Sequence, residues 1–228
     1  MDFGPFESHI GHTFRDRSLI ETAFTHRSYL NENRTPGREH NERLEFLGDA
    51  VLELVVTEFL YAKYPAKAEG ELTAYRAALV NTVSISDAAT KLGMNDYLLL
   101  SRGEARDTGR ARQIILANAF EALIGALYLD GGYEPANKFI ADNLFHKTED
   151  VVAKRLWQDP KSRFQEIAQE KAGITPRYEV VSQSGPDHDK TFVTGVYLEK
   201  EQVAKGEGRS KQEAEQSAAE NALKVRGW

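Results

Sequence analysis

The spacing of apolar residues divides this chain into two unlike parts. From about residue 18 to residue 151, apolar side chains recur at helical intervals and strand signals are scarce. The pair Asp159-Pro160 then marks a boundary, because a residue before proline is pushed out of helical geometry. We predict a mainly α-helical bundle over 1–150, a linker over 151–158 and a small second domain over 159–228.

The second part mixes helix and strand signals. Tyr, Val, Phe and Thr alternate partly with polar residues in three short segments, and Gly-Pro or Gly lies between or beside them. Helical patterns flank these segments on both sides. We predict an α+β domain in the order α-β-β-β-α, with both helices on one face of an antiparallel sheet. The five elements are expected over 161–171, 177–184, 191–199, 202–206 and 210–225.

Composition supports two folded domains and excludes several kinds of chemistry. The chain has 228 residues, of which 41% are hydrophobic and 28% charged, as in ordinary soluble proteins. It has no cysteine, so disulfide frameworks, cysteine-ligated metal centres and thiol nucleophiles are excluded. The net charge of −6 argues against binding nucleic acid by bulk positive charge. Any bound polyanion must therefore meet local basic residues or a metal ion.

Neither a membrane span nor an export signal is expected. The longest apolar stretches, such as 50–60, contain glutamate, so we expect none to approach the roughly 20 residues that cross a bilayer. The N-terminus lacks a basic segment followed by an apolar run. These features predict a cytoplasmic protein without a membrane partner.

A segment rich in carboxylates is the most informative part of the chain. With Asn41 as the N-cap of a helix, Glu42 lies in the first turn. At about 100° per residue, Glu42, Glu45 and Asp49 fall within an arc of about 60°. Phe46 lies close to this acidic side, where the core does not cover it, and this indicates a partner surface. The residues expected on the opposite, core-facing side are Leu44, Leu47, Val51 and Leu54.

A second helix, predicted over 113–130, repeats this arrangement. Asn118 and Glu121 lie three residues apart on one face. If the two helices converge, Glu45 and Asp49 would join them in a group of oxygen ligands whose like charges require a cation. Magnesium or manganese suits such ligands. The residues turned away from this face are Phe120, Leu123, Ile124 and Leu127.

Other interpretations of the acidic residues stay open at this point. A glutamate near a helix N-terminus, such as Glu42, often only stabilises the helix dipole. Acidic residues at helical spacing are usually a solvated face. The same pattern therefore also fits a helical dimerisation module that holds no metal.

Basic residues flank the start of the last predicted helix. Ser210 and Glu213 have the spacing of a capping box. Arg209 and Lys211 lie beside it, where free backbone N–H groups favour a phosphate. A capping box is common, so these residues also fit a helix start that is capped and binds no phosphate.

Side chains on the helix over 161–171 could recognise RNA by shape. Gln165 and Glu166 could hydrogen-bond 2′-hydroxyl groups in the shallow minor groove of A-form RNA. His188 is expected in a loop between two strands, and whether it has a role in RNA binding depends on this neighbouring helix. Recognition of shape needs less positive charge than a basic groove, so a near-neutral domain could still bind duplex RNA.

Three segments of the first part resemble bacterial ribonuclease III. They are Asn-Glu-Arg-Leu-Glu-Phe-Leu-Gly-Asp-Ala-Val-Leu over 41–52, Ala-Phe-Thr-His-Arg-Ser-Tyr over 23–29 and Ile-Leu-Ala-Asn-Ala-Phe-Glu-Ala-Leu-Ile-Gly over 115–125. Residues 158–225 are similar to a double-stranded-RNA-binding domain, with a Gly-Pro-x-His loop and a Gly-x-Gly-x-Ser-Lys helix start. The resemblance implies a homodimeric endoribonuclease that processes rRNA and mRNA precursors. Such an enzyme cuts both strands of duplex RNA and leaves 5′-phosphates, 3′-hydroxyls and short 3′ overhangs.

The resemblance also assigns roles to individual residues. The metal ligands would be Glu45, Asp49, Asn118 and Glu121, with Mg²⁺ as the cofactor and Mn²⁺ as a substitute. The catalytic residues would be Asp49 and Glu121, with Glu42 and Glu69 in supporting roles near the scissile phosphate. Phe46 would pack into the partner subunit, whereas His26 is interpreted as structural. No histidine is expected as a catalytic base, and no organic cofactor is expected. The RNA-binding residues would be Gln165, Glu166, Pro186, His188, Arg209, Ser210 and Lys211.

Two positions depart from the family pattern. Asn118 stands where the family usually has aspartate, so one negative charge is lost, although the amide oxygen can still coordinate magnesium. A double-stranded-RNA-binding protein with reduced or absent cleavage is therefore the alternative function. Gln212 stands where many members have lysine, which weakens phosphate contact by one charge.

Overall fold

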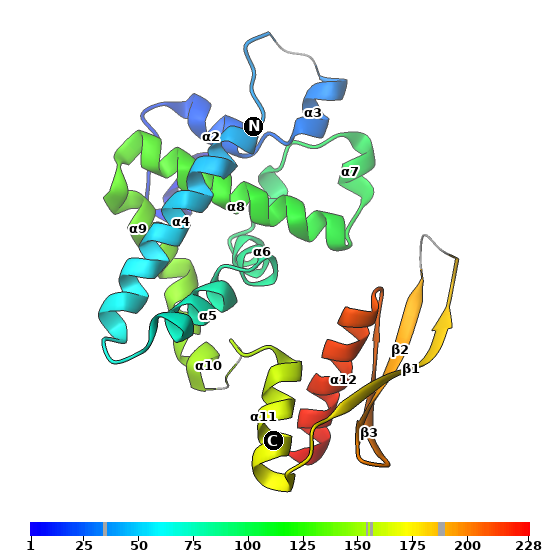
Figure 1. Ribbon diagram of the computed structural model, residues 1–228. Helices are drawn as coiled ribbons and strands as arrows, with labels where there is room; N and C mark the ends of the chain where they lie inside the picture. Colours follow the sequence, from blue (N-terminus) through cyan, green and yellow to red (C-terminus); the bar gives the residue numbers. More distant parts are fainter. Residues whose placement is uncertain (34–35, 154, 156, 187–189) are drawn as a thin grey trace. The chain divides into compact units, whose positions relative to one another are not determined.

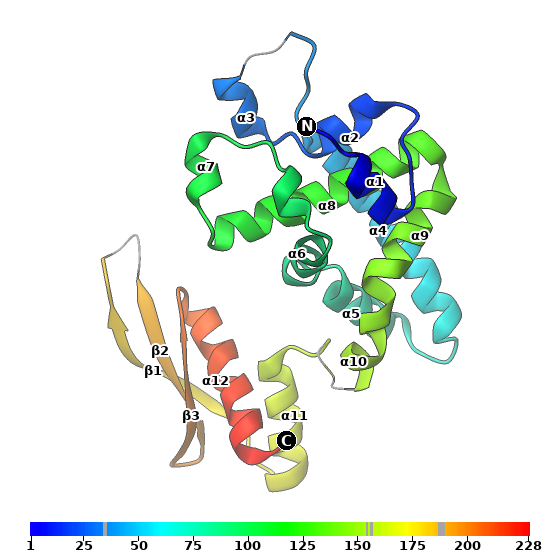
Figure 2. The same cartoon turned by 180° about the vertical axis from the view of Figure 1, so that it is seen from behind.

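Two separate units make up the chain. The computed structural model describes all residues except 34, 35, 154, 156 and 187–189. The contacts divide the chain into Met1–Trp157 and Gln158–Trp228, and each unit has its own hydrophobic core. Figures 1 and 2 show helices throughout the first unit and a helix-flanked sheet in the second. The domain bounds at 150 and 159 and the linker between them stay predictions.

The first unit is a helical bundle, as predicted. Its only extended pairing among the described residues is an isolated bridge between Thr25 and Leu99. The α-helices are α1 Gly4–Ile10, α2 Arg17–Ala23, α3 Arg27–Glu32, α4 Glu42–Lys63, α5 Glu69–Leu79, α6 Thr82–Lys91, α7 Arg102–Arg106, α8 Arg110–Gly131, α9 Tyr133–Leu144 and α10 Thr148–Ala153. Two 3₁₀ helices complete it, η1 Met94–Tyr97 and η2 Phe145–Lys147.

Helix α8 is the centre of the first unit. It packs against α2, α4, α6 and α9, and Phe120, Leu123 and Ile124 in its middle are fully buried. By length and composition α8 could cross a membrane, so the expectation that no segment approaches that length was wrong. Most of its apolar window is buried inside the unit, as in the core helix of a globular protein.

Two details of α4 differ from expectation. Asn41 precedes the helix, but its side chain makes no capping hydrogen bond. It is buried and donates instead to the carbonyl oxygen of Ala23, at 3.3 Å. Leu54 is 58% exposed rather than in the core. The buried face of α4 follows Leu52 and Val55, which meet the unit's core, and Leu54 points away from that face.

The second unit has the predicted order α-β-β-β-α. The sheet is antiparallel with strand order β1-β2-β3, and α12 packs on β2 and β3 and on α11. The sequence placed each element to within two residues of its observed ends. The elements are α11 Pro160–Ala172, β1 Arg177–Ser184, β2 Thr191–Leu198, β3 Glu201–Gly208 and α12 Lys211–Arg226.

Close backbone contact holds α12 on the sheet. A Cβ atom at Gly206 in β3 would lie 2.0 Å from the amide nitrogen of Ala218 in α12, so only glycine fits there. Ala218 is fully buried beside Phe164 of α11 and Val196 of β2 in the core of the unit. This packing leaves the start of α12 exposed at the surface.

Candidate functional site

Helices α4 and α8 cross with their backbones in direct contact. A Cβ atom at Gly48 would lie 1.7 Å from the carbonyl oxygen of Glu121, and one at Gly125 would lie 2.3 Å from that of Leu44. Only glycine leaves room at both positions. The crossing therefore puts the residues beside Gly48 next to the turn of α8 that carries Glu121.

Carboxylates from both helices act on one another at this crossing. Burial raises the pKa of Glu121 to about 7, and the charges of Asp49 and Glu45 add to this shift. Burial also raises the pKa of Glu45, again with contributions from Glu42 and Asp49. No basic side chain among the described residues contributes to either shift. The structure thus brings the carboxylates of the two predicted segments within electrostatic range of one another.

Asn118 belongs to the same face of α8 as Glu121. The two residues are three positions apart in one continuous helix, and both are partly exposed. We use the name acidic cluster for Glu45, Asp49, Asn118 and Glu121.

The donor atoms of the acidic cluster fit a divalent cation. In the described part of the chain, no three His, Cys, Asp or Glu side chains close around one point. Mg²⁺ does not need such a cage, because it usually binds one or two carboxylates and keeps several waters. Among the described residues no basic side chain offsets the half-buried charges of Glu45 and Glu121, and a bound metal ion would neutralise them. The amide oxygen of Asn118 adds a neutral ligand.

Glu42 lies at the rim of the acidic cluster. It is exposed in the first turn of α4. One carboxylate oxygen lies 3.5 Å from Nη1 of Arg27, and the other lies 3.8 Å from Nδ1 of His40. Its charge still contributes to the raised pKa of Glu45. Glu42 is therefore electrostatically connected to the cluster and partly neutralised by Arg27.

Glu69 lies apart from the acidic cluster within one chain. It begins α5, and its Oε1 accepts a hydrogen bond from Thr73 at 3.1 Å. It lines a groove of about 450 Å³ with Thr57 and Tyr61 of α4. These two residues follow Asp49 by eight and twelve positions, which is about 12 and 18 Å along a helix.

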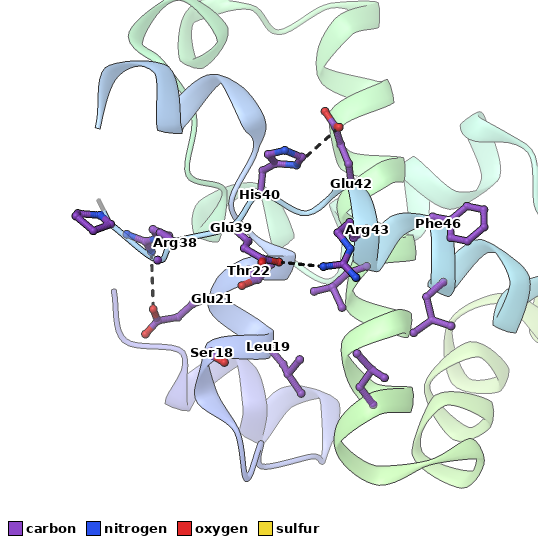
Figure 3. A pocket seen from close by; sticks show the side chains of 15 residues that line it. Ser18, Leu19, Glu21, Thr22, Arg38, Glu39, His40, Glu42, Arg43 and Phe46 are labelled. Atoms are coloured by element: carbon purple, nitrogen blue, oxygen red, sulfur yellow. Dashed lines mark ion pairs between the residues drawn. The ribbon is translucent and has the colours of Figure 1, made fainter. Parts of the chain in front are cut away.

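Phe46 stands at the edge of a large open groove. Its side chain is 82% exposed, and the groove beside it measures about 1070 Å³. Figure 3 shows Phe46 next to Arg43, which pairs with Glu39, and on the opposite side of the groove from the ion pair of Arg38 with Glu21. An exposed aromatic ring beside a groove is typical of an interaction surface.

His26 makes the contacts of a structural residue. It is the N-cap of α3, and its Nδ1 accepts a hydrogen bond from the backbone N–H of Ser28 at 3.3 Å. Burial lowers its pKa. A ring nitrogen that accepts a capping bond in a partly buried site favours a neutral imidazole.

The predicted RNA-binding residues of the second unit are at its surface. Gln165 and Glu166 are exposed on α11, and Pro186 is exposed after β1. His188 lies outside the described residues. The remaining three, Arg209, Ser210 and Lys211, are exposed where α12 begins.

A complete capping arrangement starts α12. Oγ of Ser210 accepts from the backbone N–H of Glu213 at 3.1 Å. The carboxylate of Glu213 reaches back and accepts from the N–H of Arg209 at 2.9 Å. These bonds fix the backbone next to Lys211 and confirm the helix start.

Comparison with known families covers both units. Residues 16–148 match the family described as Ribonuclease-III-like, and residues 160–226 match the double-stranded RNA binding motif. The chain belongs to the ribonuclease III family. This membership confirms the prediction of an endoribonuclease that acts on double-stranded RNA. Ribonuclease III enzymes generally need a divalent metal ion.

Relatives in the ribonuclease III family align along most of the chain. Ribonuclease 3 of Bdellovibrio bacteriovorus is 45% identical over 221 residues, which cover 96% of this chain and 94% of the relative. Ribonuclease 3 of Enterococcus faecalis is 47% identical over 214 residues, which cover 94% and 93%. Similar solved structures include the nuclease domain of ribonuclease III from Campylobacter jejuni, described as flexible in a region involved in dimer formation. It is 40% identical, covers 62% of this chain and 98% of its own, and superposes with a TM-score of 0.56.

Sequence reasoning missed the residues that let the two helices of the acidic cluster touch. Gly48 and Gly125 carry no functional group, yet they allow α4 and α8 to touch. Each lies inside an apolar helical run, where glycine costs about 1 kcal/mol relative to alanine. That unfavourable choice is a signal of close packing, and it could have drawn attention to both positions.

Proposed function

We propose that this protein hydrolyses double-stranded RNA in the acidic cluster with the help of Mg²⁺, for which Mn²⁺ can substitute. The products are 5′-phosphate and 3′-hydroxyl ends. We also propose that the protein is cytoplasmic and takes part in processing rRNA and mRNA precursors.

One observation carries this proposal. Burial and like charges raise the pKa of Glu121 to about 7. Ionised carboxylates at the α4–α8 crossing therefore destabilise the folded protein. Strongly shifted carboxylates of this kind are typical of functional sites. A divalent cation that also binds a phosphate group would remove this destabilisation, because the cation neutralises the carboxylates and binds the phosphate oxygens.

Each residue of the acidic cluster has a part in this proposal. Glu45, Asp49, Asn118 and Glu121 would hold the ion through oxygen atoms. When bound, the ion would supply Lewis-acid stabilisation of the phosphate and lower the pKa of a nucleophilic water. Asp49 and Glu121, on helices whose backbones touch, would fix the donor positions relative to one another. Glu42 and Glu69 would support the reaction from outside the cluster.

Cleavage of long duplex RNA tests the proposal. The protein should cut duplex RNA in Mg²⁺ or Mn²⁺ and not in excess chelator. Glu121→Ala should abolish cleavage and keep duplex binding, because α11 and α12 remain intact. The control Glu134→Ala removes an exposed carboxylate of α9 and should cleave normally. No cleavage by the unmodified protein at any concentration of either ion would contradict the proposal.

The second unit would hold the duplex by its exposed surface. Gln165 and Glu166 would face 2′-hydroxyl groups, and Pro186 and His188 would add further contacts to the RNA. Arg209, Ser210 and Lys211 would meet phosphate oxygens, where the exposed start of α12 supplies backbone N–H groups.

A homodimer is part of the same proposal. Phe46 would leave solvent by packing against the second subunit beside the groove, which explains why so large a ring is exposed. Phe46→Glu should give a monomer in sedimentation experiments. Val83→Glu, which alters another exposed apolar residue on α6, should leave the dimer intact. A dimeric Phe46→Glu protein would show that this interface assignment is wrong.

Asn118 favours one alternative, a protein that binds duplex RNA and cleaves it slowly or not at all. Its neutral side chain removes one negative charge from the cluster, which weakens metal binding. Asn118→Asp separates the two functions. A large gain in cleavage rate with unchanged RNA affinity would favour the alternative for the natural chain, whereas an unchanged rate would show that Asn118 does not limit the reaction.

A further inference from the structure

Helix α7 has too few contacts of its own to fix its position. It has five residues, all of them described, and none is buried. Helices this short are not stable in water without support. Groups outside α7 must therefore hold it against the first unit.

Side chains of α3 hold the start of α7. The backbone N–H of Ser101 donates to Oγ of Ser28 at 3.0 Å. The backbone N–H of Arg102 donates to the carboxylate of Glu32 at 3.1 Å. These are two of the first N–H groups of a helix, which have no partner inside it. Bonds from α3 thus replace the packing that α7 lacks.

The middle of α7 is held from α8. Nη2 of Arg112 donates to the carbonyl oxygen of Glu104 at 2.6 Å, and Nη1 donates to Asn95 at 2.9 Å. We use the name α7 clamp for the bonds that Ser28, Glu32 and Arg112 make to α7.

Ser28 is the best-supported member of the α7 clamp. Its Oγ lies 2.8 Å from Nδ1 of His26. The backbone N–H of His26 in turn donates to the carbonyl oxygen of Leu99 at 3.1 Å, two residues before Ser101. The segment around Ser28 is therefore tied twice to the segment that leads into α7.

Positive charge is concentrated on the segment that the α7 clamp holds. Residues 102–112 contain four arginines and two acidic residues, in a chain whose net charge is −6. Arg102 and Arg106 are exposed on α7. Helix α8 then runs from Arg110 to Asn118 of the acidic cluster, eight residues or about 12 Å further on. The basic segment therefore runs directly into the helix that carries Asn118 and Glu121.

We infer that Ser28 is a positioning residue for the RNA substrate. Its hydroxyl group, acting through the N–H of Ser101, holds α7 where Arg102 and Arg106 meet phosphates that flank the cleaved bond. This inference rests on the proposed function, because it takes the acidic cluster as the place of cleavage. Ser28 itself does not contact RNA in this role.

Steady-state cleavage by the full-length protein tests the inference. Ser28→Ala removes the acceptor and should raise KM for duplex RNA about tenfold, the cost of one lost hydrogen bond, with kcat changed less than about threefold. Ser28→Thr keeps the hydroxyl group and should restore the KM of the unmodified protein. The control Ser8→Ala removes a hydroxyl group that bonds within α1 and should change neither constant. An unchanged KM in Ser28→Ala overturns the inference.

A second measurement separates the α7 clamp from general loss of structure. Hydrogen exchange at the amides of Ser101 and Arg102 should accelerate in Ser28→Ala and not in Ser8→Ala. Glu32→Ala, at an exposed position, is the replacement variant if Ser28→Ala does not fold, and it should accelerate exchange at Arg102. Unchanged exchange at these amides overturns the inference.

A double-mutant cycle tests whether Ser28 acts through α7. If it does, Ser28→Ala should not raise KM further in a protein that already carries Arg102→Ala and Arg106→Ala. Additive effects would overturn the inference. If the unmodified protein cleaves no RNA, the proposed function fails, and the dissociation constants of the same variants for duplex RNA then test the α7 clamp alone.

Discussion

The two units use the same packing device for different purposes. In the first unit, Gly48 lets α4 touch α8, and in the second, Gly206 lets β3 touch α12. Beside Gly48, the contact forces half-buried carboxylates of two helices toward one another. Beside Gly206, it leaves the polar start of α12 exposed. The first site thus depends on contacts between distant segments, and the second depends on a local motif carried on a small core.

This difference decides how each site responds to change. At the α4–α8 crossing, a small displacement of either helix alters the distances among charges that are partly shielded from solvent, so electrostatic effects are larger than on the open surface. At the start of α12, solvent screens each charge, so single contacts contribute little and act almost independently.

The largest expected effect is that of Gly48→Ala. The new methyl group would lie 1.7 Å from the carbonyl oxygen of Glu121, so α4 and α8 must separate. We expect the free energy of unfolding to fall by about 3 kcal/mol or more, as for severe overpacking, and cleavage to be lost. Urea denaturation followed by circular dichroism measures the first effect.

Gly70→Ala is the matched control for Gly48→Ala. Gly70 lies in α5, with nothing within 4 Å of the position where its Cβ atom would be. Alanine there should leave stability unchanged or raise it by up to about 1 kcal/mol. If Gly48→Ala were as harmless as Gly70→Ala, the helices would not be in backbone contact and the acidic cluster would not depend on their crossing.

The next effect is a dependence of stability on pH that arises from Glu121. Because its pKa in the folded protein is raised from 4.5 to about 7, the folded state binds this proton more tightly than the unfolded state does. The resulting stabilisation is complete below pH 4.5 and is lost as pH rises through 7. With allowance for solvent screening, we expect a loss of about 1 to 2 kcal/mol in metal-free buffer.

Thermal unfolding between pH 5 and about pH 8 measures this dependence. Glu121→Gln should flatten the curve, whereas Glu134→Gln, at an exposed site, should not. Mg²⁺ added at the alkaline end should raise Tm in the unmodified protein, because an ion that binds only the folded state stabilises it. The proposed charge arrangement would be contradicted if stability rose with pH in this range, or if Glu121→Gln left the pH dependence of stability unchanged.

Sequence alone predicted the second unit better than the first site, because the second unit depends on local motifs and the first site depends on contacts between distant segments. The signals of β1 to β3 and of the start of α12 lie in neighbouring residues, as the Ser210–Glu213 bond illustrates. Which side of α4 meets α8 depends instead on residues about 75 positions away. Helical periodicity therefore found the acidic face but misplaced Leu54 and overlooked Gly48.

The capping role expected of Asn41 failed for a related reason. Asparagine favours the N-cap in isolated helices, but here tertiary structure buries the side chain and supplies a different partner, the carbonyl oxygen of Ala23. Residue type predicted where α4 begins and could not predict which hydrogen bond the side chain makes.

Lys211→Ala should have a smaller effect, confined to RNA affinity. An exposed lysine that meets one phosphate contributes about 1 kcal/mol, so affinity should fall about fivefold without dependence on RNA sequence. The slope of log Kd against log salt should fall by about one. Lys205→Ala, which alters an exposed lysine on β3, is the matched control and should bind normally. If the two substitutions changed RNA affinity equally at moderate salt, Lys211 would not be part of the RNA-binding surface.

The smallest effect separates the two interpretations of the start of α12. Ser210→Ala removes the acceptor for the N–H of Glu213 and should cost the second unit about 1 kcal/mol of stability. Ser210→Asp keeps a capping oxygen and should restore stability, yet it puts a negative charge where a phosphate is expected. If RNA affinity falls in Ser210→Asp while thermal stability does not, the helix start binds phosphate. If both remain unchanged, the capping box serves only to begin the helix, and RNA binding by this unit depends on other residues.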